Sequence, residues 1–396
     1  MSASDIDLAI VGGGLAGGLT ALAVHRAHPD MRIALIEAGE SYGGNHRWSW
    51  FDSDCGPNGD ALIGSFEAKR WTGGNAVRFP RHSRQLSADY RSLDSRDFDA
   101  GLRCLLPQNA HRLNTRVSSV ASGRITLESG ETIAAARILD CRDAVPTPHL
   151  TGGWQVFLGQ HRRMETPHGV TRPVIMDATV DQIDGYRFLY LLPLSETDLF
   201  LEDTYYQDRA ELDAPALRER IAAYCDANGW TGKIVHEETG LLPVLTGGDF
   251  EAHRKALEQP GVALASARGG FVHPLTSYTV PIAVRTALAI ADAAGRMDGA
   301  ALADFVAARA RDHWRATGYY RLLGKMLFDA ADPRERYRIF ERFYTLPEPL
   351  IERFYAARSS PLDKIRILSG KPPVPVRSAV AALLGKGAPL VQGDKS

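Results

Sequence analysis

A mixed α/β fold with three parts is predicted from three stretches of the 396-residue sequence. Near its start, an apolar strand runs into a glycine-rich turn and a helix, an order typical of nucleotide-binding domains with a parallel sheet. Residues 150–260 carry strand-like runs separated by polar turns, which predicts an antiparallel sheet. From residue 301 onward the pattern is helical. We therefore expect a nucleotide-binding domain with an inserted antiparallel substrate sheet, followed by a helical C-terminal region.

The glycine-rich turn has the full context of a Rossmann-type dinucleotide site. Gly12 permits the tight turn after the strand, Gly14 lets backbone N–H groups approach a pyrophosphate, and Gly17 lets the helix lie close to the sheet. Glu37 ends the second strand, where a carboxylate can accept hydrogen bonds from ribose hydroxyls. The acid favours an unphosphorylated ribose, hence FAD or NAD rather than NADP, and the position of the motif at the start of the chain favours FAD.

Composition excludes several classes of protein. The chain is 44% hydrophobic, and its four cysteines form no CxxC pair, so neither a metal site nor a disulfide framework is expected and a reducing cytoplasm fits best. The longest uncharged run, residues 8–24, is glycine-rich and resembles neither a signal peptide nor a membrane span. Charge is uneven, because residues 305–396 carry 17 Lys and Arg against 9 Asp and Glu. No nucleic-acid partner is expected.

The segments after Glu37 are assigned in chain order. Residues 43–51 are expected to form a loop rich in Trp and Phe, either a hydrophobic plug or an apolar wall beside the cofactor, with Gly44 close to the dinucleotide. A helix is expected at 91–104 and an apolar strand at 134–140. The expected boundaries assign 1–50, 91–145 and 261–297 to the FAD-binding domain, 51–90 and 146–260 to the substrate domain, and 298–396 to the helical region.

The run 199–206 holds the most informative carboxylates. If it is a strand, Glu202 shares one face with Phe200 and Tyr206, whereas Asp203 lies on the other face. A carboxyl among apolar groups has its charged form disfavoured, so Glu202 could stay protonated near neutrality and act as an acid. The alternative is an ordinary exposed carboxylate on a strand.

A second glycine-containing loop follows a strand at 262–265 and precedes a helix at 281–294. Its residues Gly270, His273 and Pro274 could contact the cofactor from the opposite side to the first glycine turn. His273 also has a simpler interpretation, as a hydrogen-bonding residue that orders the loop.

Four helices are expected in the C-terminal region. Aromatic residues recur at helical spacing beside Arg338, Arg342 and Arg353. They predict either packing inside the domain or an amphipathic surface resting on anionic lipid. The expected helices span 301–330, 332–344, 346–358 and 360–370.

Several motifs resemble those of the bacterial lycopene β-cyclases, and the resemblance extends over nearly the whole chain. The matching motifs are Gly43-Gly44-Asn45-His46-Arg47-Trp48-Ser49, Ile175-Met176-Asp177-Ala178-Thr179-Val180-Asp181, Glu202-Asp203-Thr204-Tyr205-Tyr206 and Arg366-Ile367-Leu368-Ser369-Gly370-Lys371-Pro372-Pro373-Val374-Pro375-Val376. One departure is Ser277, where the family has Gly. If Ser277 takes a positive φ, it costs about 1 kcal/mol relative to Gly.

The resemblance implies a flavin monooxygenase-like architecture and a reaction without net redox change. Members of this family use reduced FAD, with NAD(P)H as the electron source, to close the ψ-ends of lycopene into β-rings, giving γ-carotene and then β-carotene. Glu202 and Asp203 lie on the family's acidic motif and are the expected catalytic residues. Lycopene and related ψ-end carotenoids are the expected substrates, and the expected location is cytoplasmic, peripheral on the inner face of an anionic membrane. The alternatives are a flavin-dependent monooxygenase or polyene reductase, and a lipid-binding flavoprotein without activity.

Overall fold

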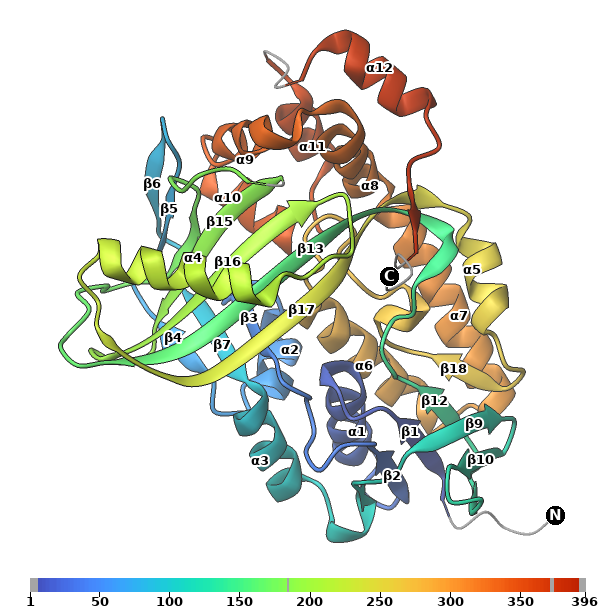
Figure 1. The fold of residues 1–396 in the computed structure, drawn as a ribbon. Coiled ribbons are helices and arrows are strands. Elements are labelled where there is room, and N and C mark those ends of the chain that lie inside the picture. The colour runs from blue at the N-terminus through green and yellow to red at the C-terminus, as the bar shows by residue number, and fades with distance from the viewer. Residues whose placement is uncertain (1–5, 184, 371–373, 392–396) are drawn as a thin grey trace.

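A five-stranded parallel sheet forms the base of the computed structural model, which describes residues 6–183, 185–370 and 374–391 (Figure 1). Its central strands are fully buried, as their unbroken apolar sequences require for a parallel sheet covered on both faces. The strands, in spatial order, are β18 (Val262–Leu264), β12 (Ile138–Asp140), β1 (Leu8–Val11), β2 (Ile33–Ile36) and β8 (His111–Arg112).

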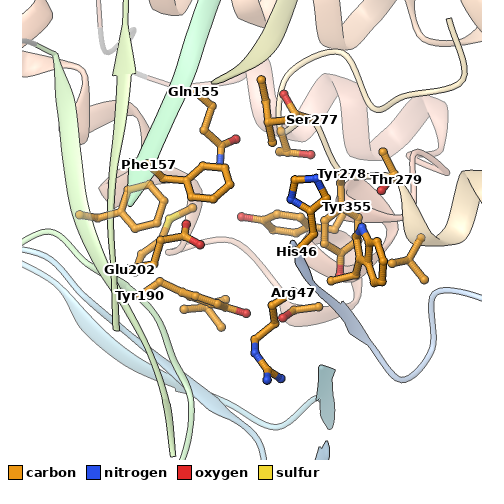
Figure 2. Close-up of a pocket in the computed structure, with 18 of the residues that line it drawn as sticks. His46, Arg47, Gln155, Phe157, Tyr190, Glu202, Ser277, Tyr278, Thr279 and Tyr355 are labelled. Atoms are coloured by element: carbon orange, nitrogen blue, oxygen red, sulfur yellow. The ribbon is translucent and has the colours of Figure 1, made fainter. Parts of the chain in front are cut away.

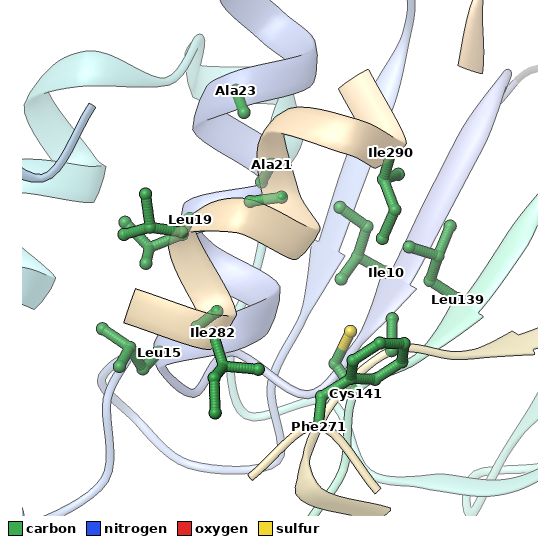
Figure 3. Packing of buried hydrophobic residues seen from close by; sticks show 14 of the residues in the cluster. Ile10, Leu15, Leu19, Ala21, Ala23, Leu139, Cys141, Phe271, Ile282 and Ile290 are labelled. Carbon is green, nitrogen blue, oxygen red and sulfur yellow. The ribbon is translucent and has the colours of Figure 1, made fainter. Parts of the chain in front are cut away.

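Each face of this sheet is covered by a different layer. On one face, α1 (Leu15–Ala27) and α6 (Val280–Ala294) pack together, and their apolar side chains meet Ile10 and Leu139 of the sheet (Figure 3). On the other face, Val11 and Ile36 pack against a small antiparallel sheet. Its strands are β9 (Val117–Ala121), β10 (Arg124–Leu127) and β11 (Thr132–Ala134). This arrangement confirms the predicted nucleotide-binding domain.

The predicted antiparallel sheet is also present, within a larger sheet of eight strands in which one pair, 174–177 with 75–78, runs parallel and the other pairs are antiparallel. Helix α4 (Ala214–Ala227), capped by the Asp213 side chain, covers its outer face, while its other face turns towards the nucleotide-binding domain (Figure 1). The strands, in order, are β17 (Gly232–Gly248), β13 (Thr147–Met164), β16 (Asp198–Gln207), β15 (Tyr186–Pro193), β14 (Val174–Asp177), β5 (Asn75–Arg78) and β6 (Ser83–Leu86), with β19 (Pro389–Leu390) also paired to β13.

A three-stranded sheet joins the two domains and corrects two expectations. Residues 47–51, expected to be a loop, form β3, and the first four residues of the expected helix at 91–104 belong to β7. These two strands pair with each other, and the expected domain boundaries, after residue 50 and before residue 91, each fall inside one of them. Asp94 ends β7 and caps the following helix by accepting a hydrogen bond from the Arg96 N–H. The elements are β3 (Arg47–Phe51), α2 (Gly56–Ile63), β4 (Lys69–Trp71), β7 (Tyr90–Asp94) and α3 (Ser95–Leu105).

The C-terminal region is helical, as predicted, but its first helix is divided. The expected helix at 301–330 breaks at Thr317, whose hydroxyl donates to the His313 carbonyl, and it ends in a π-helical turn. The tail motif is partly described, because residues 371–373 lie outside the described ranges. The elements are α7 (Gly299–Ala316), α8 (Gly318–Lys325), the π-turn (Met326–Ala330), a 3₁₀ turn (Pro333–Glu335), α9 (Tyr337–Phe343), α10 (Glu348–Tyr355), α11 (Pro361–Leu368) and α12 (Val376–Leu384).

The aromatic stripes of this region face inward, which confirms their interpretation as packing. Phe340, Phe343, Tyr344 and Phe354 are buried in one cluster with the aromatic residues of the antiparallel sheet. Because these aromatic side chains are buried, they do not form a membrane-facing surface. Among the helices of the described residues, none combines the length and the apolar character that a membrane crossing requires.

Candidate active site

The glycine turn after β1 has the geometry that a dinucleotide needs. Gly12 has a φ of 102°, and a Cβ on Gly17 would lie 2.0 Å from the Gly12 carbonyl oxygen, so neither position accepts a side chain. Beside Gly14, by contrast, a Cβ would meet nothing within 4 Å, which leaves open space before the N-terminus of α1. No side chain caps this helix, so its first N–H groups and its positive dipole end face that space.

Glu37 closes the other side of this space. Its two carboxylate oxygens accept hydrogen bonds from the Gly13 and Gly39 N–H groups, each at 2.8 Å. These contacts hold the carboxylate at the end of β2, beside the glycine turn, where the sequence places the ribose-binding acid. The residues present therefore fit the phosphates and ribose of FAD.

The segment from Gly43 leads from the nucleotide turn to a second cavity. The Gly43 N–H donates to the Gly13 carbonyl at 2.9 Å, and Gly44, with a φ of 62°, redirects the exposed chain into β3. On β3, Trp48 lines the cavity, whereas Trp50 is fully buried behind it. Trp50 thus fits the interpretation as a hydrophobic plug, whereas Trp48 forms part of the wall of this cavity.

The cavity, the candidate substrate pocket, has a volume of about 300 Å³ and lies between the antiparallel sheet, β3 and the N-terminus of α6 (Figure 2). Its lining is rich in aromatic and aliphatic side chains, which suits an apolar substrate. Two buried polar atoms on its wall, Gln155 Oε1 and Thr276 Oγ1, have no hydrogen-bond partner within the described part of the chain. Together with the helix end of α6, they fit the polar edge of a flavin ring. The apolar lining includes Trp48, Phe51, Phe157, Ile175, Met176, Phe188, Tyr190, Leu242, Tyr206 and Tyr355.

Glu202 extends from β16 into this pocket (Figure 2). Burial raises the pKa of its carboxyl to about 7, with a smaller rise from the charge of Asp203, while the hydrogen bond that Thr204 Oγ1 donates at 2.5 Å acts in the opposite direction. The group retains partial solvent accessibility through the pocket. A carboxylic acid that is about half protonated at pH 7, and mostly neutral below it, therefore faces this cavity.

Asp203 lies on the opposite face of β16, as strand alternation requires. Its carboxylate is completely buried and accepts two hydrogen bonds from Arg187, at 2.8 and 3.2 Å, and one from Tyr205 Oη at 2.8 Å. The structure thus brings Glu202, but not Asp203, to the pocket.

The His273 ring holds the loop before α6 through hydrogen bonds to the backbone. The ring Nδ1 accepts hydrogen bonds from two backbone N–H groups, those of Leu275 and Thr276, so Nε2 carries the proton and donates to the Phe354 carbonyl. Burial lowers the pKa of His273 to about 3, which keeps the ring neutral. This arrangement supports the loop-ordering interpretation.

Other residues of this loop are structural in different ways. Gly270 has a φ of 89°, and a Cβ there would lie 2.6 Å from the Phe250 ring, while the Pro274 carbonyl accepts a hydrogen bond from the Leu245 N–H. Ser277 does take a positive φ, of 54°, and its hydroxyl donates to the Pro243 carbonyl at 2.8 Å.

The sequence analysis missed the second carboxyl of the pocket. Glu238 lines the cavity from β17, and burial raises the pKa of its carboxyl to about 9, with a further rise from the charge of Glu202. The strand itself was not predicted, although the β-branched residues Ile234 and Val235 signal its start.

Fold and site together define the class of this protein, an FAD-binding α/β enzyme with a separate apolar substrate pocket. The chain is similar in structure to p-nitrophenol 4-monooxygenase from Pseudomonas putida, with a TM-score of 0.59 at 14% identity, covering 93% of this chain and 99% of that one. It is also similar to a flavin-dependent halogenase from Brevundimonas sp. BAL3, with a TM-score of 0.55 at 13% identity and coverages of 88% and 84%. At these identities the likeness shows the fold, and it confirms the predicted flavin monooxygenase-like architecture.

The family follows from the sequence comparisons. Residues 7–381 match the family described as lycopene cyclase protein. The chain is 43% identical over 379 residues to the lycopene beta-cyclase of Pseudescherichia vulneris, covering 96% of this chain and 97% of that protein. This chain belongs to the lycopene cyclase family, which confirms the predicted resemblance.

Proposed function

We propose that this chain closes the two ψ-ends of lycopene into β-rings, through γ-carotene to β-carotene, by acid catalysis without net redox change. The observation that carries this proposal is the carboxyl of Glu202 in a pocket rich in aromatic side chains, where burial raises its pKa to about 7 and so keeps much of it protonated at neutral pH. An acid in these surroundings can protonate a carbon–carbon double bond while bulk water is excluded.

In the proposed reaction, Glu202 donates its proton to carbon 2 of the terminal double bond, which leaves a tertiary cation at carbon 1. The electron pair of the double bond between carbons 5 and 6 then forms the new bond between carbons 1 and 6, moving the cation to carbon 5. Loss of the proton from carbon 6 completes the β-ring. The first step leaves Glu202 on the pocket wall as a carboxylate, so we assign it the recovery of this proton. Asp203, on the other face, supports the strand.

The aromatic wall and the cofactor would stabilise the positive charge. The rings of Trp48, Tyr190 and Tyr206 line the pocket and could each contribute about 0.5–2 kcal/mol of cation–π stabilisation. Reduced flavin, when bound, supplies an electron-rich ring and a negative charge opposite the developing cation. Gly12, Gly14, Gly17 and Glu37 would hold its dinucleotide part, and the segments around Gly44 and 270–279 its ring. We propose NAD(P)H as the source of its electrons.

Anaerobic turnover of lycopene with chemically reduced FAD in deuterated water tests this function. We expect one deuterium in each new ring and no stoichiometric oxidation of the reductant. Oxidation of one reductant per product would instead identify a polyene reductase, and a product that forms only after oxygen is admitted would identify a monooxygenase. Tight binding of lycopene without product would identify a lipid-binding flavoprotein.

A lipid-facing surface is also part of the proposal, because lycopene dissolves in bilayers. We define the α11–α12 surface by exposed apolar side chains on two consecutive helices at the edge of the molecule (Figure 1). Leu384 is 83% exposed and Leu362 is 77% exposed. The other members of the surface are Ile365, Leu368, Val380 and Leu383.

Charge around the α11–α12 surface favours an anionic bilayer as its partner. Between residues 358 and 391 the sequence has six basic residues and one acidic residue, Asp363, which is already paired with Arg353 at 2.6 Å. The arginines first expected to face lipid are engaged within the protein, since Arg338 is paired with Glu335 and Arg342 donates to the Ser369 carbonyl. The proposed location is therefore peripheral, on the inner face of the cell membrane.

Vesicle flotation with the double variant Leu383→Ser, Leu384→Ser tests this surface. Each leucine that inserts contributes roughly 1–3 kcal/mol, so we expect binding to phosphatidylglycerol-containing vesicles to weaken at least tenfold. Ile234→Ser removes an exposed apolar residue of β17 and serves as the control. Wild-type flotation by the double variant, or equal flotation on phosphatidylcholine alone, would contradict the proposal.

A further inference from the structure

A second carboxyl shares the pocket wall with Glu202 and has no part in the reaction as proposed above. Glu202 on β16 and Glu238 on β17 are both paired in register with Gly159 of the intervening strand β13. Residues directly opposite one another on neighbouring strands project from the same face of a sheet. The two carboxyls therefore flank one glycine on the pocket side.

The glycine gives the Glu238 side chain room to lie over the central strand. A Cβ at Gly159 would be 3.1 Å from Glu238 Cγ and 2.5 Å from the Phe200 ring. A side chain at this position would clash with the Phe200 ring and crowd the Glu238 stem. The absence of a side chain at Gly159 thus lets both pack over the central strand, with the two carboxyls on the pocket wall.

The surroundings of Glu238 keep a hydrogen on its carboxyl. The residue is 4% exposed, and within the described part of the chain it forms no hydrogen bond or ion pair with another side chain. Burial and the charge of Glu202 raise the pKa of Glu238, Asp94 raises it further, and Arg47 lowers it. The Arg47 guanidinium, however, is already bound to Asp94 at 2.6 Å. Near neutral pH, Glu238 therefore has an O–H group to donate.

We propose that Glu238 is a positioning residue that donates a hydrogen bond, directly or through one water molecule, to the Glu202 carboxylate formed when the proton leaves for the substrate. This inference rests on the proposed function. The hydrogen stays on Glu238 throughout, and Glu202 alone gives and recovers the proton, so the reaction stays balanced. The bond is stronger to the ionised than to the neutral Glu202, so it lowers the free energy of the carboxylate and makes Glu202 a stronger acid.

Two substitutions distinguish the effect of losing the hydrogen-bond donor at Glu238 from the effect of changing its packing. Glu238→Gln keeps the volume and an N–H donor, and its turnover number with lycopene and reduced FAD is expected within about threefold of wild type. Glu238→Met keeps the length and removes the donor, and it is expected to lose about 10- to 100-fold in turnover number with an unchanged KM, as for a lost hydrogen bond to a charged group. The pH above which the turnover number of Glu238→Met falls should be higher than in the wild type, because the Glu202 carboxylate is less stabilised and its pKa is therefore higher.

Glu237→Gln is the matched control, with the same chemical change on the same strand but on the other face. Glu237 binds Arg218 away from the pocket, so wild-type kinetics are expected. Wild-type turnover by Glu238→Met would overturn the proposal, as would equal losses in both Glu238 variants with an unmoved pH limb. If Glu238→Met does not fold, Glu238→Gln decides, since a loss of more than about tenfold despite the retained donor contradicts the role. Failure of the wild type to cyclise lycopene would refute the proposed function instead.

Discussion

The two faces of β16 place adjacent carboxyls in opposite electrostatic situations. On the face towards α4, Asp203 is completely buried but has a fixed counterion, Arg187, and a hydroxyl donor. On the pocket face, Glu202 has one hydroxyl donor and no ion pair among the described residues. A buried carboxyl with a cation holds the structure together, whereas one without a cation keeps its proton available. The two environments indicate a structural role for Asp203 and are consistent with the proposed catalytic role of Glu202.

The largest effect is expected for Glu202→Gln, which removes the proposed proton donor. Cyclisation should fall about 10³-fold or more, since no other neutral carboxyl replaces it in position, while the amide keeps the volume. Product chromatography measures the loss, and flavin absorbance together with thermal melting shows whether the protein remains loaded and folded. Retained cyclisation would transfer the acid role to another residue.

Asp203→Asn should instead act on folding. It leaves the Arg187 charge buried without its partner, so the free energy of unfolding should fall by about 3–5 kcal/mol in urea titrations. The double variant Arg187→Met, Asp203→Leu should recover most of this loss, because it removes both charges. An Asp203→Asn protein as stable as wild type would contradict the assignment of Asp203 to structure.

The pH dependence of stability tests the second pocket carboxyl. Because the pKa of Glu238 is raised to about 9, the folded state binds a proton that the unfolded chain releases above about 4.5, so this group makes the protein less stable as pH rises between these values. The slope is up to ~1.4 kcal/mol per pH unit. Glu238→Gln should remove it, and the decline in melting temperature from pH 6 to pH 9 should become smaller. An identical decline in wild type and variant would show that Glu238 ionises normally.

The smallest expected effect concerns the pH profile of turnover. The protonated form of Glu202 is the active one, so the wild-type rate should be level at acid pH and fall above about pH 7, where its carboxyl ionises. The charge of Asp203 contributes to the raised pKa of Glu202, so Asp203→Asn should move this limb to slightly lower pH. If the rate of Asp203→Asn instead began to fall at a higher pH than that of the wild type, this would contradict the electrostatic coupling across the strand.

The local parts of the site followed from the sequence because contiguous residues encode them. The turn from Gly12 to Gly17 needs only a strand, three glycines and a helix in order, and alternation along β16 separates Glu202 from Asp203 whatever surrounds the strand. The left-handed conformation of Ser277 was likewise predictable from one position.

Contacts between distant segments were decided by the tertiary structure. Glu238 became a neighbour of Glu202 only through the register of β17, β13 and β16, and Arg187 met Asp203 through the pairing of β15 with β16. The C-terminal aromatic residues had the same helical spacing whether they faced lipid or a core, and only the docking of α9 and α10 on the sheet buried them. Periodicity determines which residues share a face, but the element that covers this face depends on strand register and packing, which are set by residues far apart in the chain.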